Sequence, residues 1–354
     1  MTTLAGRTIA ALRSEQDGLA ALVPSLTPDQ LTGPSGASAW TIADVLSHLG
    51  SGAEITRAGF LAAVGRAEAP GPDFNQSVWD RWNASSPQDQ ATGSISANET
   101  LVADLESVPG DRHEELRVRT FLPDPVPFAL FAGLRLSEVA QHTWDVRVGL
   151  DPSAALSGES AEVLAEHLAG GLGFLLGFIG KPKEAPEQAV VAISGTPYRI
   201  VIEESVRFTT DDLPATATFT GPLEAVLRLL YGRLSAAHTP AGTDVTGNLT
   251  LDDLRATFPG FSRPGRRRRP VSRSGTGRRP PGTPHVRPGR GPAADRPPRT
   301  CAARPARTTG PPGGRAGTWR GRCRPSSSRS TGTTGPPRRR SVARRPRRRR
   351  PGRP

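Results

Sequence analysis

Cysteine is nearly absent from this chain of 354 residues: it has two cysteines, Cys301 and Cys323, and both lie beyond residue 300. Residues 1–261 therefore contain no disulfide, no cysteine-based zinc site and no thiol nucleophile. If this part of the chain takes part in sulfur chemistry, the thiol has to come from outside it.

Long apolar runs are missing as well. The N-terminus meets Arg7, Arg13 and Glu15 before a secretory apolar segment could develop, and the apolar run at 168–180 is too short and too rich in glycine to span a bilayer. We therefore expect a soluble, cytoplasmic protein that has no membrane partner.

Residues 262–354 lack almost every residue type that builds a hydrophobic core. They contain 29 Arg, no Lys, one acidic residue (Asp295) and no Leu, Ile, Phe, Tyr or Met. These arginines and the single acid give the segment a charge of +28, whereas the whole chain has +13, so residues 1–261 have −15. Two chemically different segments therefore meet near Phe261.

We expect residues 262–354 to be disordered, because they have too few large apolar side chains to offset the entropy of ordering the backbone. The Arg runs at 266–269 and 347–350 would suit an arm that binds polyanions without specificity for a nucleic-acid sequence. The alternative, which we favour, is a frameshift product, since a GC-rich gene translated in the wrong reading frame yields this composition.

Helical patterns dominate residues 1–150. Apolar residues at helical spacing predict a first helix over 5–23, and Thr41 and Asp44 have the spacing of a capping box that opens a second helix within 40–64. A polar loop follows, then a third helix near 98–108 and a fourth that begins at Pro127. Four helices with mostly short links predict a four-helix bundle.

Residues 151–261 change in character. A helix at about 159–178 is followed by β-branched, alternating segments and then by a helical pattern over 222–236. The expected strands are 189–195, 198–205 and 216–221. The sequence therefore predicts an α+β protein, with a bundle in 1–150, a small α+β domain in 151–261 and a disordered tail in 262–354.

One stripe of the fourth helix carries an unusual set of residues. Phe131, Leu134, Glu138, His142 and Asp145 are spaced by three or four, so they share one face, and the apolar members place that face inward. No Lys or Arg lies on the same stripe to pair with Glu138. A buried carboxylate without a partner is costly, so we expect a cation to come from elsewhere.

Glu138 and His142 lie one helical turn apart and can converge on one metal ion. His48 lies on the inner stripe of the second helix and would complete a His₂Glu set, the composition of catalytic zinc sites that keep one coordination position open. Asp145 either orients a metal ligand or forms a salt bridge with Arg147 or with a neighbouring helix.

The segments 40-WTIADVLSHLG-50 and 137-SEVAQHTWDV-146 together resemble the mycothiol-dependent maleylpyruvate isomerase family. The resemblance implies a DinB-like N-terminal bundle and a sterol-carrier-like C-terminal domain, with His48, Glu138 and His142 as zinc ligands. Arg233, in 231-YGR-233, is similar to an arginine of the family's C-terminal domain that is implicated in activity. It is our candidate for the guanidinium that binds a dicarboxylate substrate.

The resemblance further implies that mycothiol, a small-molecule thiol, binds to the open position of the zinc ion (Zn²⁺) as a thiolate. The thiolate would add to the double bond of maleylpyruvate, the resulting single bond would rotate, and elimination would release fumarylpyruvate. The partners are then mycothiol and a small electrophile, and the sequence does not separate an isomerase from a thiol S-transferase. Two alternatives remain: a metal-dependent hydrolase on the same bundle, or a non-enzymatic metal-binding or regulatory protein.

Overall fold

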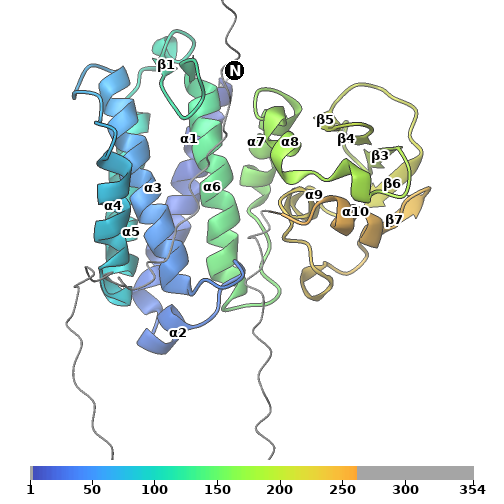
Figure 1. The fold of residues 1–354 in the computed structure, drawn as a ribbon, viewed down its shortest axis with the longest axis horizontal. Coiled ribbons are helices and arrows are strands. Elements are labelled where there is room, and N and C mark those ends of the chain that lie inside the picture. Colours follow the sequence, from blue (N-terminus) through green and yellow to red (C-terminus); the bar gives the residue numbers. More distant parts are fainter. Residues whose placement is uncertain (1–2, 261–354) are drawn as a thin grey trace, which may run out of the picture. The chain divides into compact units, whose positions relative to one another are not determined.

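The structure, a computed structural model, describes residues 3–260 (Figure 1). A helical bundle is followed by a domain with a mixed sheet, which confirms the predicted α+β class. Residues 262–354 were predicted to be disordered, and to be either a polyanion-binding arm or a frameshift product. These residues lie outside the part of the chain that the structure describes.

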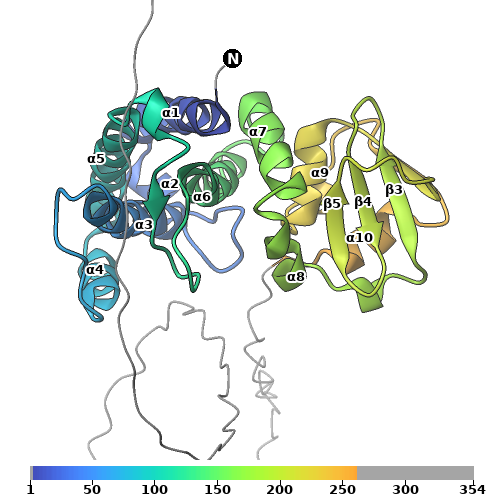
Figure 2. The ribbon, with the colours of Figure 1, turned by 90° about the horizontal axis from the view of Figure 1, so that it is seen from above.

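Four long helices run side by side in the bundle: α1 (Leu4–Leu22), α3 (Ile42–Ala63), α5 (Pro87–Glu106) and α6 (Phe128–Val148) (Figures 1 and 2). Helix α3 packs mainly against α5, and α1 mainly against α6. The predicted capping box is present, because the Thr41 side chain accepts a hydrogen bond from the Asp44 amide while the Asp44 carboxylate accepts one from the Thr41 amide. The start of α3 is therefore fixed by two residues that are only three positions apart in sequence.

The region predicted as a long polar loop is largely helical, so that prediction was wrong. Helix α4 (Phe74–Asn83) lies within it, and α5 begins at Pro87 rather than near Asn98. Trp82 of α4 is buried, and a Cβ atom at Gly50 of α3 would lie 2.1 Å from its ring. The ring of Trp82 thus docks on a glycine of another helix, and one such contact leaves no apolar periodicity in the sequence.

Short elements complete the bundle at its ends. They are η1 (Val23–Ser25), α2 (Pro28–Thr32), η2 (Gly110–Arg112) and the antiparallel pair β1 (Arg117–Val118) and β2 (Val126–Pro127). The backbone amide of Phe128, the first residue of α6, donates to the carbonyl of Leu116, just before β1. This hairpin therefore anchors the entry of α6.

The predicted helix over 159–178 is interrupted. It consists of α7 (Gly158–Ala169), η3 (Gly173–Leu175) and α8 (Leu176–Ile179), with a bend of 82° between the two helical parts. The bend lies at Gly170 and Gly171, since Gly170 has non-helical backbone angles (φ −118°, ψ −124°). Two adjacent glycines favour such a break because they lack the side chains that restrict the backbone.

The sheet has the strand order β5-β4-β3-β6-β7, and its neighbours pair antiparallel except β3 and β6, which are parallel. Strand β5 was not predicted as a separate strand. The remaining elements include α9, whose end contributes to the site described below. The bounds are β3 (Ala189–Ile193), β4 (Arg199–Ile202), β5 (Val206–Thr209), β6 (Ala217–Thr220), β7 (Asp244–Gly247), η4 (Pro182–Glu184), α9 (Leu223–Leu230), η5 (Ala236–His238) and α10 (Leu251–Thr257).

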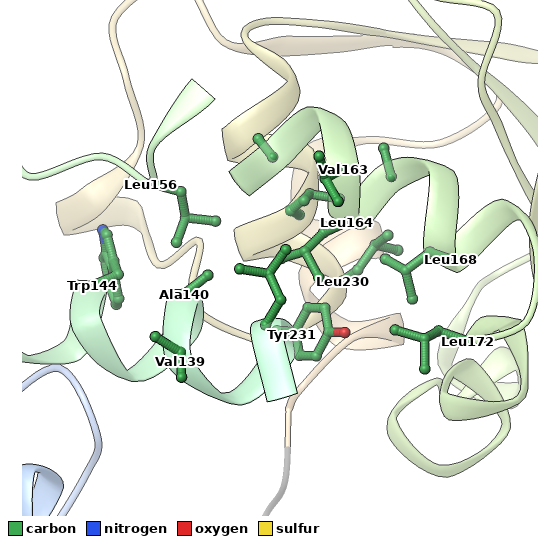
Figure 3. Packing of buried hydrophobic residues seen from close by; sticks show 14 of the residues in the cluster. Val139, Ala140, Trp144, Leu156, Val163, Leu164, Leu168, Leu172, Leu230 and Tyr231 are labelled. Atoms are coloured by element: carbon green, nitrogen blue, oxygen red, sulfur yellow. The ribbon is translucent and has the colours of Figure 1, made fainter. Parts of the chain in front are cut away.

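One hydrophobic core joins the bundle to the α+β domain. Figure 3 shows side chains of α6, α7 and the end of α9 packed together, among them Trp144, Leu164 and Leu230, all nearly or fully buried. Helix α7 also packs against α1. Helix α6 is therefore covered on most of its circumference, by bundle helices on one side and by α7 and α9 on the other.

Within residues 3–260 no single helix is long and apolar enough to cross a membrane. The bent pair of Gly158–Ala169 and Gly173–Ile179 meets the requirements of length and composition only when its two parts are taken together.

Candidate metal centre

The structure brings His48, Glu138 and His142 together. His48 belongs to the second turn of α3, and Glu138 and His142 lie one turn apart on α6. Nε2 of His48 is 3.0 Å from Oε2 of Glu138, and Nε2 of His142 is 3.7 Å from the same oxygen. One potential ligand atom from each residue lies within 4.8 Å of the other two. Two imidazole nitrogens and one carboxylate oxygen therefore point at a common position.

These distances suit a tetrahedral metal ion. Two ligands at about 2.0–2.1 Å from a tetrahedral zinc ion lie about 3.3–3.4 Å apart. The two measured separations, 3.0 and 3.7 Å, lie on either side of that value. Small side-chain rotations would therefore place the three donor atoms around one ion, and the donor set itself is that of catalytic zinc sites.

The triad is more open to solvent than its sequence pattern predicts. The exposed fraction of the side chain is 52% for Glu138, 35% for His48 and 14% for His142. The expectation that Glu138 is a buried carboxylate was therefore wrong. The carboxylate of Glu138 is open to solvent although Phe131 and Asp145 on the same stripe are buried, so a small molecule can approach Glu138.

The carboxylate of Glu138 is ionised in this setting. Although desolvation by the surrounding protein would raise its pKa, the hydrogen bond from His48 and the charges of His48, His142 and Arg135 lower the pKa of Glu138 to about 2. An ionised carboxylate is the form that binds a metal ion.

A buried carboxylate fixes the orientation of His142. Oδ2 of Asp145 lies 2.8 Å from Nδ1 of His142, and the Asp145 side chain is fully buried. Burial would raise the pKa of Asp145, but the bonds and charges of His142 and Arg233 hold it below its usual value. The carboxylate is therefore an acceptor, Nδ1 of His142 carries the proton, and Nε2 presents its lone pair to the triad.

Burial, the largest influence, also lowers the pKa of His142 itself, which favours the neutral ring. A neutral imidazole is the form that binds a metal ion.

Arg233, which follows α9, reaches the same carboxylate. Its Nε and Nη2 donate to Oδ1 and Oδ2 of Asp145 at 3.0 and 2.7 Å. This contact occupies two nitrogens of the guanidinium that we expected to bind a substrate. Arg147, which the sequence suggested as a salt-bridge partner of Asp145, instead has its Nη2 3.8 Å from Oε2 of Glu15. The structure therefore joins Arg233, Asp145 and His142 in one chain of hydrogen bonds.

Trp40 flanks the triad, and the sequence pattern gave it no role. Its ring is stacked on that of His142 (centroids 5.9 Å apart, interplanar angle 25°) and tilted against that of His48 (5.3 Å). In the sequence, Trp40 directly precedes the capping residue Thr41 and is the first residue of the segment 40-WTIADVLSHLG-50. Gly36 anchors the loop that carries Trp40, since its amide donates to the carbonyl of Asp145 (2.8 Å).

A second contact joins α6 to the end of α9. The hydroxyl groups of Ser137 and Tyr231 lie 2.6 Å apart, and both residues are buried. Burial, together with the charge of Glu138, raises the pKa of Tyr231 to about 12, despite the opposing effect of the bond to Ser137. Tyr231 is therefore a neutral hydroxyl at physiological pH.

Comparisons with known proteins bear on this site. Residues 12–147 match the family model described as Mycothiol maleylpyruvate isomerase N-terminal domain. An uncharacterised protein of Mycobacterium tuberculosis, found in strains CDC 1551 / Oshkosh and ATCC 25618 / H37Rv, is 29% identical over 151 residues, which cover 41% of this chain and 69% of the relative.

Two solved structures, of the mycothiol-dependent maleylpyruvate isomerase and of a histidine-to-alanine mutant, are similar at 17% and 16% identity, with TM-scores of 0.48 and 0.46. They cover 70% and 66% of this chain, and 96% and 92% of their own. The family match covers each member of the triad, and it confirms the resemblance that the two sequence segments indicated. Residues 12–147 of this chain are therefore similar to the Mycothiol maleylpyruvate isomerase N-terminal domain.

Proposed function

We propose that His48, Glu138 and His142 bind a divalent metal ion, zinc by their donor types, and that the protein is a mycothiol-dependent enzyme. Its reaction is either the isomerisation of maleylpyruvate or a related electrophile, or the transfer of the thiol to such an electrophile. The observation that carries the proposal is the convergence of two imidazoles and one carboxylate within 4.8 Å, on a domain of this family.

A zinc ion with an open position would lower the pKa of a coordinated thiol and so supply a thiolate at neutral pH. The residues of the chain prepare the site for this. His142 is held neutral by burial and is oriented by Asp145, and Glu138 is ionised. Because residues 1–261 contain no cysteine, the thiol has to come from outside this part of the chain, in agreement with mycothiol as the partner.

We propose that Arg233 acts through Asp145 as a positioning residue, instead of binding the substrate directly. Its Nε and Nη2 are both bonded to Asp145, and Nη1 donates to the carbonyl of Tyr231 (3.3 Å). A guanidinium in this arrangement holds the carboxylate that holds His142.

The test is an activity screen of the full-length, zinc-loaded protein against maleylpyruvate and small electrophiles, with and without added mycothiol. We expect turnover only with both zinc and mycothiol. The His48→Ala variant serves as the inactive control, because it removes one ligand. Turnover that does not depend on thiol would contradict the proposal and would assign the site to a hydrolase with metal-activated water.

A further inference from the structure

Arg135 lies one turn before Glu138 on α6, and its side chain is buried inside the bundle (5% exposed). Its Nη2 donates to the carbonyl of Leu49 (2.7 Å) and to Oδ1 of Asn98 (2.6 Å). Leu49 follows His48 in the chain, so Arg135 ties the backbone beside one triad residue to the helix that carries the other two.

The positive charge of Arg135 has no acidic partner in contact. Within residues 3–260 no carboxylate lies within 4.0 Å of its guanidinium, and Nε is buried without a hydrogen bond. Burial lowers the pKa of Arg135 to about 10, against the raising effect of the Glu138 charge, so the side chain is still charged at neutral pH. Burying an unpaired charge is costly, and such groups are normally paired.

The guanidinium of Arg135 packs against a glycine at Nη1. Gly52 lies one turn after His48 on α3, and a Cβ atom there would be 2.8 Å from Nη1 of Arg135. No described residue forms a hydrogen bond with Nη1. Gly52 is partly exposed, and Nη1 is not enclosed in the way that Nε is. Glycine in a helix interior costs about 0.5–1 kcal/mol relative to alanine, and here it lets one nitrogen of a buried cation lie against the helix backbone.

We infer that Nη1 of Arg135, at the edge of the guanidinium beside Gly52, binds a carboxylate of the bound electrophile. The inference rests on the proposed function and names the side chain that holds this carboxylate. Gly52 lies four positions after His48 on α3, which corresponds to about 6 Å along the axis. One carboxylate on Arg135 would therefore place the rest of a small dicarboxylate beside the triad.

The test measures binding of unreactive probes to the full-length, zinc-loaded protein by calorimetry. Succinate is the dicarboxylate probe, acetate reports a carboxylate that binds the metal alone, and succinamide is the uncharged analogue of succinate. We expect wild-type protein to bind succinate at least tenfold more tightly than acetate, and succinamide not detectably. In Arg135→Gln and in Gly52→Ala the affinity for succinate should fall to that for acetate.

Gly52→Ala is the more informative variant, since its methyl group would lie 2.8 Å from Nη1 and displace that nitrogen while the side chain of Arg135 keeps its charge. Gly59→Ala is the matched control on the same helix, because a Cβ atom there meets only the carbonyl of Arg119, at 3.6 Å. It should bind succinate as wild type does. Wild-type affinity for succinate in Gly52→Ala would overturn the inference, whatever Arg135→Gln does.

Zinc content, measured for each variant, distinguishes this inference from the proposed function. If wild-type protein takes up no zinc, the proposed function fails, and the titrations are carried out on metal-free protein. These titrations then test whether Arg135 binds succinate without a metal ion. Succinate binding that is lost in Gly52→Ala and kept in Gly59→Ala would still support the inference, and equal binding in all three proteins would overturn it.

Discussion

Asp145 and Arg233 are 88 positions apart in the chain, yet two hydrogen bonds of 3.0 and 2.7 Å join them. The same carboxylate contacts Nδ1 of His142 at 2.8 Å. One buried aspartate thus connects a candidate metal ligand on the bundle to an arginine that follows α9. This connection determines which nitrogen of His142 is available to a metal ion.

The variant Asp145→Asn should weaken zinc binding by about 10–100-fold, the usual cost of losing the partner of a ligand histidine. An amide accepts the Nδ1 proton less strongly and does not balance the charge of Arg233. Competition with a chromophoric chelator measures the affinity. Asp17→Asn, which changes an exposed carboxylate (66%), is the control. Equal affinities in the two variants would show that Asp145 does not support the site.

Replacing Arg233 separates its two possible roles. If it acts through Asp145, Arg233→Gln should lower zinc affinity in the absence of any substrate, by less than Asp145→Asn does, because the bond between Asp145 and His142 remains. If it binds the substrate, zinc affinity should stay at the wild-type value while KM rises. We expect the lower zinc affinity. Measuring zinc affinity and KM for the same variant distinguishes the two roles of Arg233.

His142→Ala should abolish metal binding and activity while changing the stability of the metal-free protein by about 1 kcal/mol or less. Glu138 is half exposed and can be hydrated, and Asp145 keeps its bonds to Arg233. Urea denaturation of metal-free wild type and variant measures the difference. A loss of several kcal/mol would mean that His142 is part of the folding core.

His167 should make the protein less stable in mild acid. Burial lowers its pKa from 6.5 to about 4, so between these values the unfolded chain binds a proton that the folded one does not. Stability therefore falls as the pH drops through this window, by about 2 kcal/mol between pH 7 and pH 5. The side chain is 2% exposed, and its Nε2 donates to the Thr8 hydroxyl, which itself donates to the Leu4 carbonyl.

His167→Gln removes the titrating group, so its stability should change less than that of wild type over the same interval. Denaturation of both metal-free proteins at pH 7 and pH 5 makes the comparison. Identical slopes against pH would assign the acid sensitivity to other groups.

Local sequence signals were sufficient to predict part of the fold. The start of α3 was predictable because Thr41 and Asp44 cap the helix by themselves, and Pro127 likewise precedes the first residue of α6. The early start of α5 and the presence of α4 were not predictable, since Trp82 docks on Gly50 of another helix. No local pattern encodes that contact.

The same distinction applies to the site. Spacing on a helix identified Glu138 and His142 as neighbours, and a shared inner stripe pointed to His48. Periodicity shows which residues share a face but not which neighbours cover it, so the exposure of Glu138 was missed. The contact of Arg233 with Asp145 depends on how α9 packs against α6, and no pattern within either segment reveals it.

The chain of bonds from Arg233 through Asp145 to His142 has a thermodynamic consequence. A metal ion that prefers the oriented form of His142 also prefers the state in which Arg233 is in place, and this preference is reciprocal. Metal binding would therefore strengthen the attachment of the sheet-containing half of the molecule to the helical half. Local opening of that attachment would weaken retention of the metal, so the two halves would lose their structure and their ion in a single cooperative transition.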